Sequence, residues 1–150
     1  MSPELISAMA VLKGAVAREE MSIRLYSRAL DAFENPEARK VLSFLRAEEM
    51  THLKKLKQAL EQKPEQVIGS PGAEAEYTQV KAAAPASLSE AKTPGQIVAF
   101  AIRHEEKSIE YFSRYVDAFR GTALGDLFDL LRREERLHRE KLLSAFSQYL

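Results

Sequence analysis

The chain has 150 residues, with 22 basic and 22 acidic side chains that give a formal net charge of zero, and it contains no cysteine. This length suits a single domain with one sizeable hydrophobic core. A neutral chain has no overall attraction for nucleic acid or for an anionic membrane surface. The lack of cysteine excludes disulfides, zinc ribbons, iron–sulfur clusters, a rubredoxin-type iron site and a thiol nucleophile.

The N-terminal segment Met1-Ser2-Pro3-Glu4 lacks the basic start and unbroken apolar run of a signal peptide. No stretch of the sequence approaches the roughly 18 apolar residues that a membrane-spanning helix needs. We therefore expect a cytoplasmic protein that has neither a membrane nor a nucleic acid as a partner.

Two helices are expected in the first part of the chain, over about residues 2–61. Ser2 would cap the first helix and Pro3 would occupy its first turn. Asn35 followed by Pro36 predicts the start of the second helix. Because only a short connection separates the two helices, we expect them to form an antiparallel hairpin.

Residues 62–92 are expected to form a long crossover between the two halves of the protein. Proline and glycine recur through this segment and exclude one continuous helix. One long connection of this kind is typical of ferritin-like bundles. We expect the crossover to let the third helix begin at the same end of the bundle as the first. Residues 73–80 could form a short helix or pack on a partner subunit.

A second hairpin is expected over about residues 93–149. Thr93 and Gln96 have the spacing of a capping box, Gly121 should end the third helix, and Thr122 should cap the fourth. In the fourth helix, steps of four and three residues define a stripe that faces the bundle interior. This interior stripe consists of Leu124, Phe128, Leu131, Glu135, His138, Leu142 and Ala145. Similar stripes run along the other three helices.

The two halves of the chain repeat each other. Shifting residues 15–60 by 86 positions places them without a gap on residues 101–146, with 18 identities over 46 positions. Ordinary composition would give about 3 identities. Such a repeat indicates one helical hairpin duplicated within the chain. The predicted fold is therefore an all-α, ferritin-like antiparallel four-helix bundle made of two duplicated helical hairpins with one long crossover, in a single domain over residues 1–150.

Each predicted helix carries one glutamate in the middle of its interior stripe, where an apolar residue is expected. The four are Glu19, Glu49, Glu105 and Glu135, and two Glu-x-x-His motifs add His52 and His138. An isolated buried carboxylate costs several kcal/mol, and four that face one another repel. No lysine or arginine occupies the stripes. The cluster therefore requires either cations or bound protons.

Two divalent metal ions would neutralise four carboxylates. Residues at i and i+3 share one face of a helix, so Glu49 and His52 can bind together, as can Glu135 and His138. One Glu from each of two helices plus a Glu-x-x-His from each of the other two is the ligand set of di-iron and di-manganese carboxylate bundles. Oxygen and imidazole ligands favour iron or manganese, although zinc could bind. A protonated polar core without metal is the alternative. We predict that all six residues are metal ligands and, as such, the catalytic residues.

Other polar residues near the stripes have simpler interpretations. Four glutamates next to the predicted ligands should be solvated or hydrogen-bonded to them: Glu20, Glu48, Glu106 and Glu134. His104 matches Arg18 in the other repeat, and we expect an exposed side chain rather than a third imidazole ligand. Tyr26 is either a core aromatic with a satisfied hydroxyl or a phenol that acts beside the metals, by hydrogen bonding or in radical or electron transfer.

These motifs resemble the rubrerythrin-like branch of the ferritin-like superfamily. The family's first pattern is a small and an apolar residue ahead of a glutamate, with an aromatic pair seven positions after the glutamate. This pattern is similar to residues 15–19 with 25–26 and to residues 101–105 with 111–112. Its second pattern, Glu-Glu-x-x-His, occurs at residues 48–52 and 134–138. The resemblance covers both hairpins and implies a di-iron centre with one histidine on each iron. It further implies that Glu49 and Glu135 bridge the irons and that Glu19 and Glu105 are terminal ligands.

Two features differ from rubrerythrins proper. The chain lacks their cysteine-ligated rubredoxin domain, which feeds electrons to the di-iron site. Ser108, matched by Ser22, stands where the family has an additional glutamate one turn beyond the third-helix ligand.

The resemblance implies a non-haem di-iron oxidoreductase that reduces peroxide or dioxygen. Its cofactor would be two iron ions, and its electrons would come from an external donor or from Fe(II). Two alternatives stay open: a ferroxidase that stores or delivers iron, and a structural interaction module whose metals only stabilise the fold. We expect a homodimer or a higher homo-oligomer.

Overall fold

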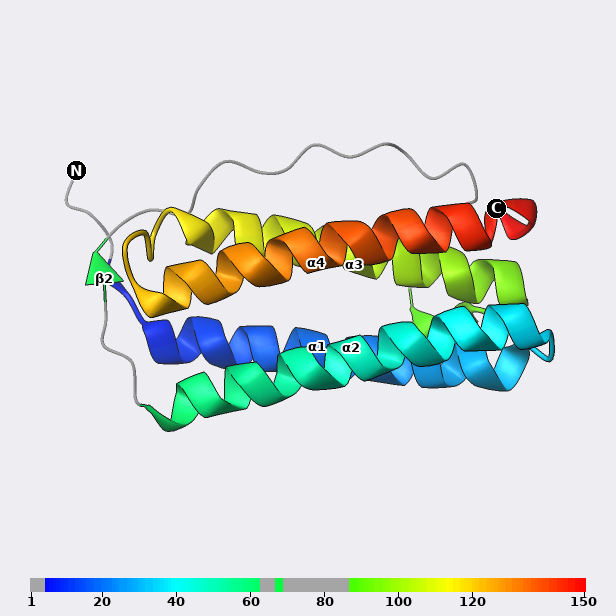
Figure 1. Cartoon of the computed structure of the whole chain (residues 1–150), viewed down its shortest axis with the longest axis horizontal. Helices are drawn as coiled ribbons and strands as arrows, with labels where there is room; N and C mark the ends of the chain where they lie inside the picture. Colours follow the sequence, from blue (N-terminus) through cyan, green and yellow to red (C-terminus); the bar gives the residue numbers. More distant parts are fainter. Residues whose placement is uncertain (1–4, 63–66, 69–86) are drawn as a thin grey trace.

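Four long helices lie side by side as a bundle in the computed structural model of the protein (Figure 1). They are α1 (Ala8–Ala32), α2 (Pro36–Glu61), α3 (Pro94–Val116) and α4 (Ala123–Ala145). The structure describes residues 5–62, 67–68 and 87–150. Within these residues the fold is all-α apart from one two-stranded ladder, so the prediction of four helices is confirmed.

Four short elements accompany the helices. The strands β1 (Leu5–Ile6) and β2 (Val67–Ile68) pair in antiparallel fashion, and two 3-10 helices are η1 (Leu88–Glu90) and η2 (Ser147–Tyr149). Most of the predicted crossover lies outside the described residues, including residues 73–80. None of the helices in the described ranges has the length and hydropathy required to cross a lipid bilayer.

Three of the four helix starts follow the predicted capping residues. The Asn35 side chain accepts hydrogen bonds from backbone amides in the first turn of α2. Thr93 and Gln96 form the complete capping box of α3, in which each side chain bonds the other residue's backbone. Thr122 caps α4, directly after Gly121, whose φ of 81° is in the left-handed region that glycine tolerates. These local signals position the ends of the helices that carry the glutamates.

The start of α1 differs from the prediction. The expectation that this helix begins near Ser2 was wrong, because Leu5–Ile6 is extended and α1 begins at Ala8. Ser7 is the N-cap, and its side chain accepts a hydrogen bond from the Ala10 amide at 3.3 Å. Pairing with β2 satisfies the backbone of β1 outside the helix, and Ser7 provides a cap at the next position.

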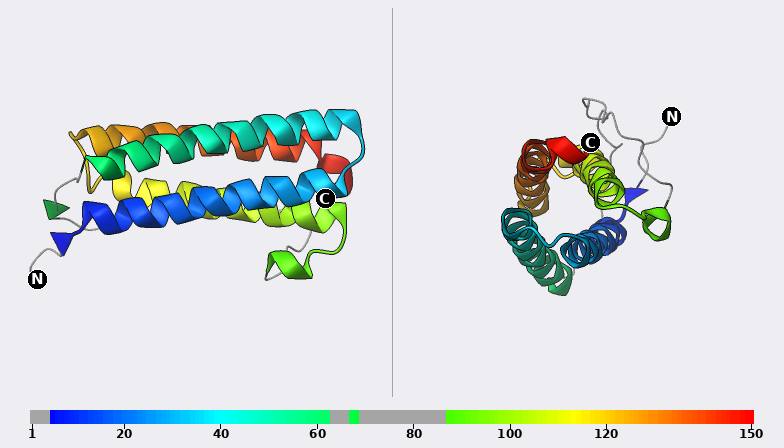
Figure 2. Two further views of the ribbon diagram at one scale, coloured as in Figure 1. Left: turned by 90° about the horizontal axis from the view of Figure 1, so that it is seen from below. Right: turned by 90° about the vertical axis from the view of Figure 1, so that its right-hand side faces the viewer.

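The two hairpins run in opposite directions along the bundle. The ring of Phe33, which caps the C-terminus of α1, lies with its centroid 5.1 Å from that of Phe146, directly after α4. Near the other end, the Tyr111 hydroxyl of α3 donates a hydrogen bond to the Val11 carbonyl of α1 at 2.6 Å. α3 therefore begins at the end where α1 terminates, as Figures 1 and 2 show.

This direction corrects the expectation that the third helix begins at the same end as the first. Because α2 is antiparallel to α1, it already ends beside the start of α1. The segment between α2 and α3 therefore connects opposite ends of the bundle. Around the bundle, α1 packs against α2 and α3, and α4 packs against the same two helices (Figure 2). The two repeated hairpins are thus antiparallel to each other.

Two hydrophobic clusters fill the bundle on either side of its middle. The first includes Tyr26, Leu30, Leu42, Leu45, Val98, Ile102 and Leu142. The second includes Leu12, Leu56, Phe112, Phe128 and Leu131. Most residues of the predicted α4 stripe are buried, but Ala145 is exposed, as the last residue of that helix. The polar residues of the interior lie between the two clusters.

Candidate metal centre

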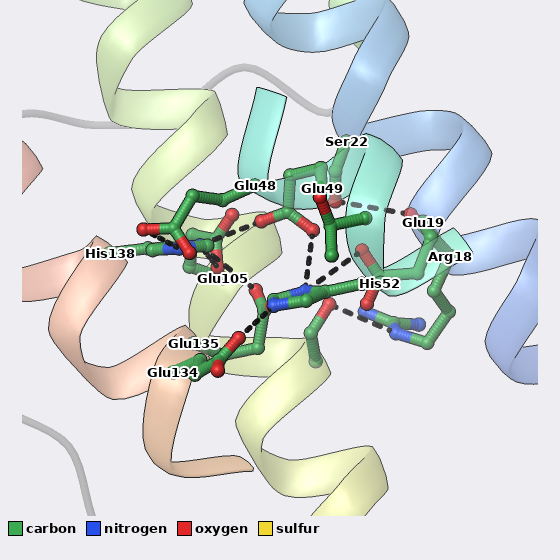
Figure 3. Close-up of polar contacts among 12 residues, drawn as sticks. Arg18, Glu19, Ser22, Glu48, Glu49, His52, Glu105, Glu134, Glu135 and His138 are labelled. Carbon is green, nitrogen blue, oxygen red and sulfur yellow. Dashed lines mark hydrogen bonds and ion pairs between the residues drawn. The ribbon is translucent and has the colours of Figure 1, made fainter. Parts of the chain in front are cut away.

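The six predicted ligand residues meet in the middle of the bundle (Figure 3). Each helix contributes one glutamate, and α2 and α4 each add a histidine almost one turn further on. The relative exposures are 1% for Glu19, 0% for Glu49, Glu105, Glu135 and His52, and 3% for His138. The interior stripes of the sequence therefore located these residues correctly, including their burial.

The six side chains form two overlapping groups of four. One group consists of Glu19, Glu49, His52 and Glu135, and the other of Glu49, Glu105, Glu135 and His138. Within each group, one possible ligand atom of every residue lies within 4.8 Å of those of the other residues. Two carboxylates, those of Glu49 and Glu135, belong to both groups. Either group could hold a metal ion, and a pair of ions would share these two carboxylates.

Many polar atoms of this cluster have no well-aligned hydrogen bond among the described residues. Both carboxylate oxygens of Glu19 and of Glu135 lack one, as do one oxygen of Glu49 and one of Glu105. A buried polar group without a partner costs about 1–3 kcal/mol, and a charged group costs more. Cations among these oxygens would satisfy them together. The donors are carboxylate oxygens and imidazole nitrogens, which suit iron, manganese or zinc, so the residues fit a pair of such ions.

Without a cation, this cluster would hold protons instead. Burial raises the pKa of Glu49, Glu105 and Glu135 well above the ordinary value, and repulsion among the carboxylates raises it further. Burial by itself lowers the pKa of His52, but its contacts with the surrounding carboxylates outweigh this and raise it. Burial, with the nearby charge of His52, lowers the pKa of His138 to about 3. A metal ion would displace these protons and convert the carboxyl groups into anionic ligands.

The two histidines direct their Nδ1 atoms toward the carboxylates. His52 Nδ1 lies 2.9 Å from Glu135 Oε1, and His138 Nδ1 lies 2.8 Å from Glu49 Oε1. Their rings are stacked, with centroids 5.5 Å apart and planes inclined by 11°. Each imidazole therefore contacts a glutamate shared by both groups, and does so across the interface between α2 and α4.

The outer nitrogens of these histidines face glutamates of the opposite helix. His52 Nε2 is hydrogen-bonded to Glu134 Oε2, and His138 Nε2 lies 3.9 Å from Glu48 Oε1. These two glutamates are the first residues of the Glu-Glu-x-x-His motifs, and each faces the histidine of the other motif, but only Glu134 is hydrogen-bonded to it. A carboxylate on the far side of a ligating imidazole orients the ring and raises its basicity. Glu134 thus has a structural role toward His52, whereas Glu48 lies too far from His138 for a hydrogen bond.

Tyr26 contacts the cluster directly. Its hydroxyl donates a hydrogen bond of 2.7 Å to Glu105 Oε1, and both side chains are buried. Burial and the nearby carboxylates raise the pKa of the phenol, so it remains a donor at neutral pH. The matching residue of the other repeat is Phe112, which has no hydroxyl to offer Glu19. The two ligand groups therefore differ in their surroundings.

Arg18 also joins α1 to α3 beside the cluster (Figure 3). Arg18 Nε donates to Ser108 Oγ at 3.2 Å, and Ser22 Oγ donates to the Arg18 carbonyl at 3.1 Å. His104 Nε2 lies 3.0 Å from the same carbonyl, and burial lowers its pKa to about 4. The expectation of an exposed His104 was wrong, because α1 packs closely against this face of α3. His104 belongs to neither ligand group, as expected.

The remaining glutamates beside the ligands have different surroundings. Glu20 is exposed, whereas Glu106 is buried and its Oε2 accepts a hydrogen bond from Arg139 Nε at 3.2 Å. The sequence did not distinguish the two, since they occupy matching positions in the repeats. The bridge from Arg18 to Ser108 was also not predicted, because no periodic pattern relates an arginine on one helix to a serine on another.

Comparisons of the chain with protein-family models, with curated proteins and with solved structures found no match. The interpretation of the site therefore depends on its own geometry: a buried cluster of carboxylates and imidazoles that could hold metal.

Proposed function

We propose that the protein is a rubrerythrin-like, non-haem di-iron oxidoreductase that reduces peroxide or dioxygen. The observation that supports this most strongly is that two four-residue ligand groups share Glu49 and Glu135. Two ions held by common carboxylates are close enough to act on one small molecule. Structural zinc sites, in contrast, are closed tetrahedra without shared carboxylates.

The direction of the helices supports a ferritin-like topology. The hairpins are antiparallel to each other, and the chain between α2 and α3 connects opposite ends of the bundle. Ferritin-like bundles have one such long connection and take their ligands from all four helices, as this chain would.

The chain's own residues would hold the metals and shield them. Glu19 with His52 would serve one ion, Glu105 with His138 the other, and Glu49 with Glu135 both. Two ferrous ions bound there would supply one electron each. These two electrons, together with two protons, are what the reduction of one hydrogen peroxide molecule to two waters requires. The hydrophobic clusters on either side limit the access of bulk water. Since the chain has no cysteine for a rubredoxin-type site, a separate donor or further Fe(II) would restore the electrons.

Anaerobic loading with Fe(II) followed by stoichiometric peroxide tests this function. We expect two ferrous ions to bind per chain and both to be oxidised rapidly by one peroxide. Glu49→Gln should abolish the oxidation, and Glu20→Gln, at an exposed position beside the cluster, should leave it unchanged.

Three other outcomes would contradict the proposal. Metal binding without rapid oxidation would favour a structural role. Uptake of many irons per chain in an assembled shell would favour storage. A protein that binds no metal at all would leave only the protonated polar core.

A further inference from the structure

A groove between α2 and α4 leads from the surface toward the cluster. Its lining includes Phe44, Glu48, Leu137, His138, Glu140 and Lys141. The groove has a volume of about 560 Å³. Six water molecules, the shell of a hydrated divalent cation, occupy roughly 180 Å³ in liquid water. The groove can therefore admit a cation with much of its hydration shell.

Glu48 and His138 connect this groove to the interior. The Glu48 side chain is 34% exposed, whereas that of His138 is only 3% exposed. His138 Nε2 is buried without a hydrogen-bond partner among the described residues and lies 3.9 Å from Glu48 Oε1. The opposite nitrogen of the same ring lies 2.8 Å from Glu49 Oε1, inside the cluster. The His138 ring thus has one edge toward the groove and one toward the predicted ligands.

The corresponding arrangement in the other repeat is closed by a direct contact. His52 Nε2 is hydrogen-bonded to Glu134, so that nitrogen already has a partner. Glu48, His52 and His138 also form a third group whose possible ligand atoms lie within 4.8 Å of one another. An oxygen and imidazole nitrogens are a suitable donor set for a divalent transition-metal ion.

We propose that divalent metal ions reach the interior through the α2/α4 groove and are first held by Glu48 and His138. This inference depends on the proposed metal centre. The charges of the groove agree with it: Glu48 and Glu140 are opposed by one cation, Lys141, whose Nζ lies 4.1 Å from the centre of the Phe44 ring. An acidic lining attracts cations and accelerates their association.

The rate of Co(II) uptake by the metal-free full-length protein, followed by stopped-flow absorbance, tests this route. Glu48→Gln should lower the second-order rate constant about fivefold or more, because it removes the charge at the floor of the groove. Saturating Co(II) should still give two ions per chain. The control variant Glu20→Gln, at an exposed position that does not line the groove, should leave the uptake rate within about twofold of the unmodified protein.

An exposed residue provides a second, opposite change. Lys141→Gln should raise the uptake rate, since it removes the one cation among the described residues that line the groove. Uptake by Glu48→Gln at the unmodified rate, equal slowing by Glu20→Gln, or no acceleration by Lys141→Gln would each overturn the route. If the unmodified protein binds no Co(II), the metal centre itself is refuted, which is a distinguishable result.

Discussion

Tyr26 on α1 donates a 2.7 Å hydrogen bond to Glu105 on α3, the glutamate that occupies the position equivalent to Glu19 in the second repeat. Phe112 stands in the equivalent position to Tyr26, so Glu19 receives no such bond from that residue. One glutamate of the cluster is therefore oriented by a phenol, and its counterpart in the other repeat is not. The two predicted metal positions should accordingly differ in affinity.

Tyr26→Phe should weaken the binding of one of the two metal ions and leave the other nearly unchanged. Loss of a group that orients a metal ligand typically reduces affinity about tenfold or more. Stepwise titration with Mn(II), followed by calorimetry, would resolve the two affinities. Tyr111→Phe is the control, because the Tyr111 phenol bonds the Val11 carbonyl and not a predicted ligand. Equal weakening of both ions would contradict the assigned asymmetry.

Substitution of shared and unshared glutamates should have different effects on metal stoichiometry. Glu49→Gln removes a carboxylate that belongs to both ligand groups, so both ions should be lost. Glu19→Gln affects only one group, and we expect one ion to remain bound. Metal analysis after equilibrium dialysis measures the number directly. One ion retained by Glu49→Gln would show that this residue does not bridge.

The metal-free protein should become less stable as the pH rises above about 4.5. The pKa values of Glu49, Glu105 and Glu135 are raised in the folded protein. Their stabilising contribution to the free energy of unfolding is therefore fully present below about pH 4.5, and it is lost as the pH rises toward their pKa values in the folded protein. Each group protonated only in the folded state contributes a slope of about 1.4 kcal/mol per pH unit. The raised pKa of His52 acts in the same direction. The lowered pKa of His138, about 3, destabilises the fold only as the pH falls below 6.5.

Urea denaturation in a chelator at pH 6.5, 7.5 and 8.5 measures this dependence. Saturating Mn(II) should cancel or reverse the decline, because metal binding requires deprotonated ligands and becomes more favourable as the pH rises. A metal-free protein whose free energy of unfolding is constant over this range would show that the carboxyl groups are not protonated in the folded state.

Gly125→Ala should destabilise the protein through the turn between α3 and α4. A Cβ atom at this position would lie 2.2 Å from the Phe119 carbonyl oxygen and 2.8 Å from its carbon, both of which are backbone atoms. Relief requires a backbone shift, which typically costs about 1–3 kcal/mol. Ser43→Ala, at an exposed position of α2, should change the free energy of unfolding by less than about 0.5 kcal/mol. Equal stability of the two variants would contradict this close approach.

Much of the fold and of the site could be predicted because the relevant signals are local. A cap such as Thr93 with Gln96 acts over three residues, and the position of Glu105 on an interior stripe follows from the helical period. The 86-residue repeat then related the ligands of one hairpin to those of the other. The start of α1 at Ala8 was missed, since it depends on pairing between β1 and the distant strand β2.

The sequence by itself determined that six polar residues are buried together, because period and duplication require no knowledge of how the helices pack. Only the tertiary structure decided the direction of the second hairpin and the contacts that follow from it. Glu134 contacts His52, and Tyr26 contacts Glu105, because the hairpins are antiparallel to each other and their matching positions therefore lie opposite one another. Contacts between residues about 80 positions apart depend on that arrangement and not on any local pattern.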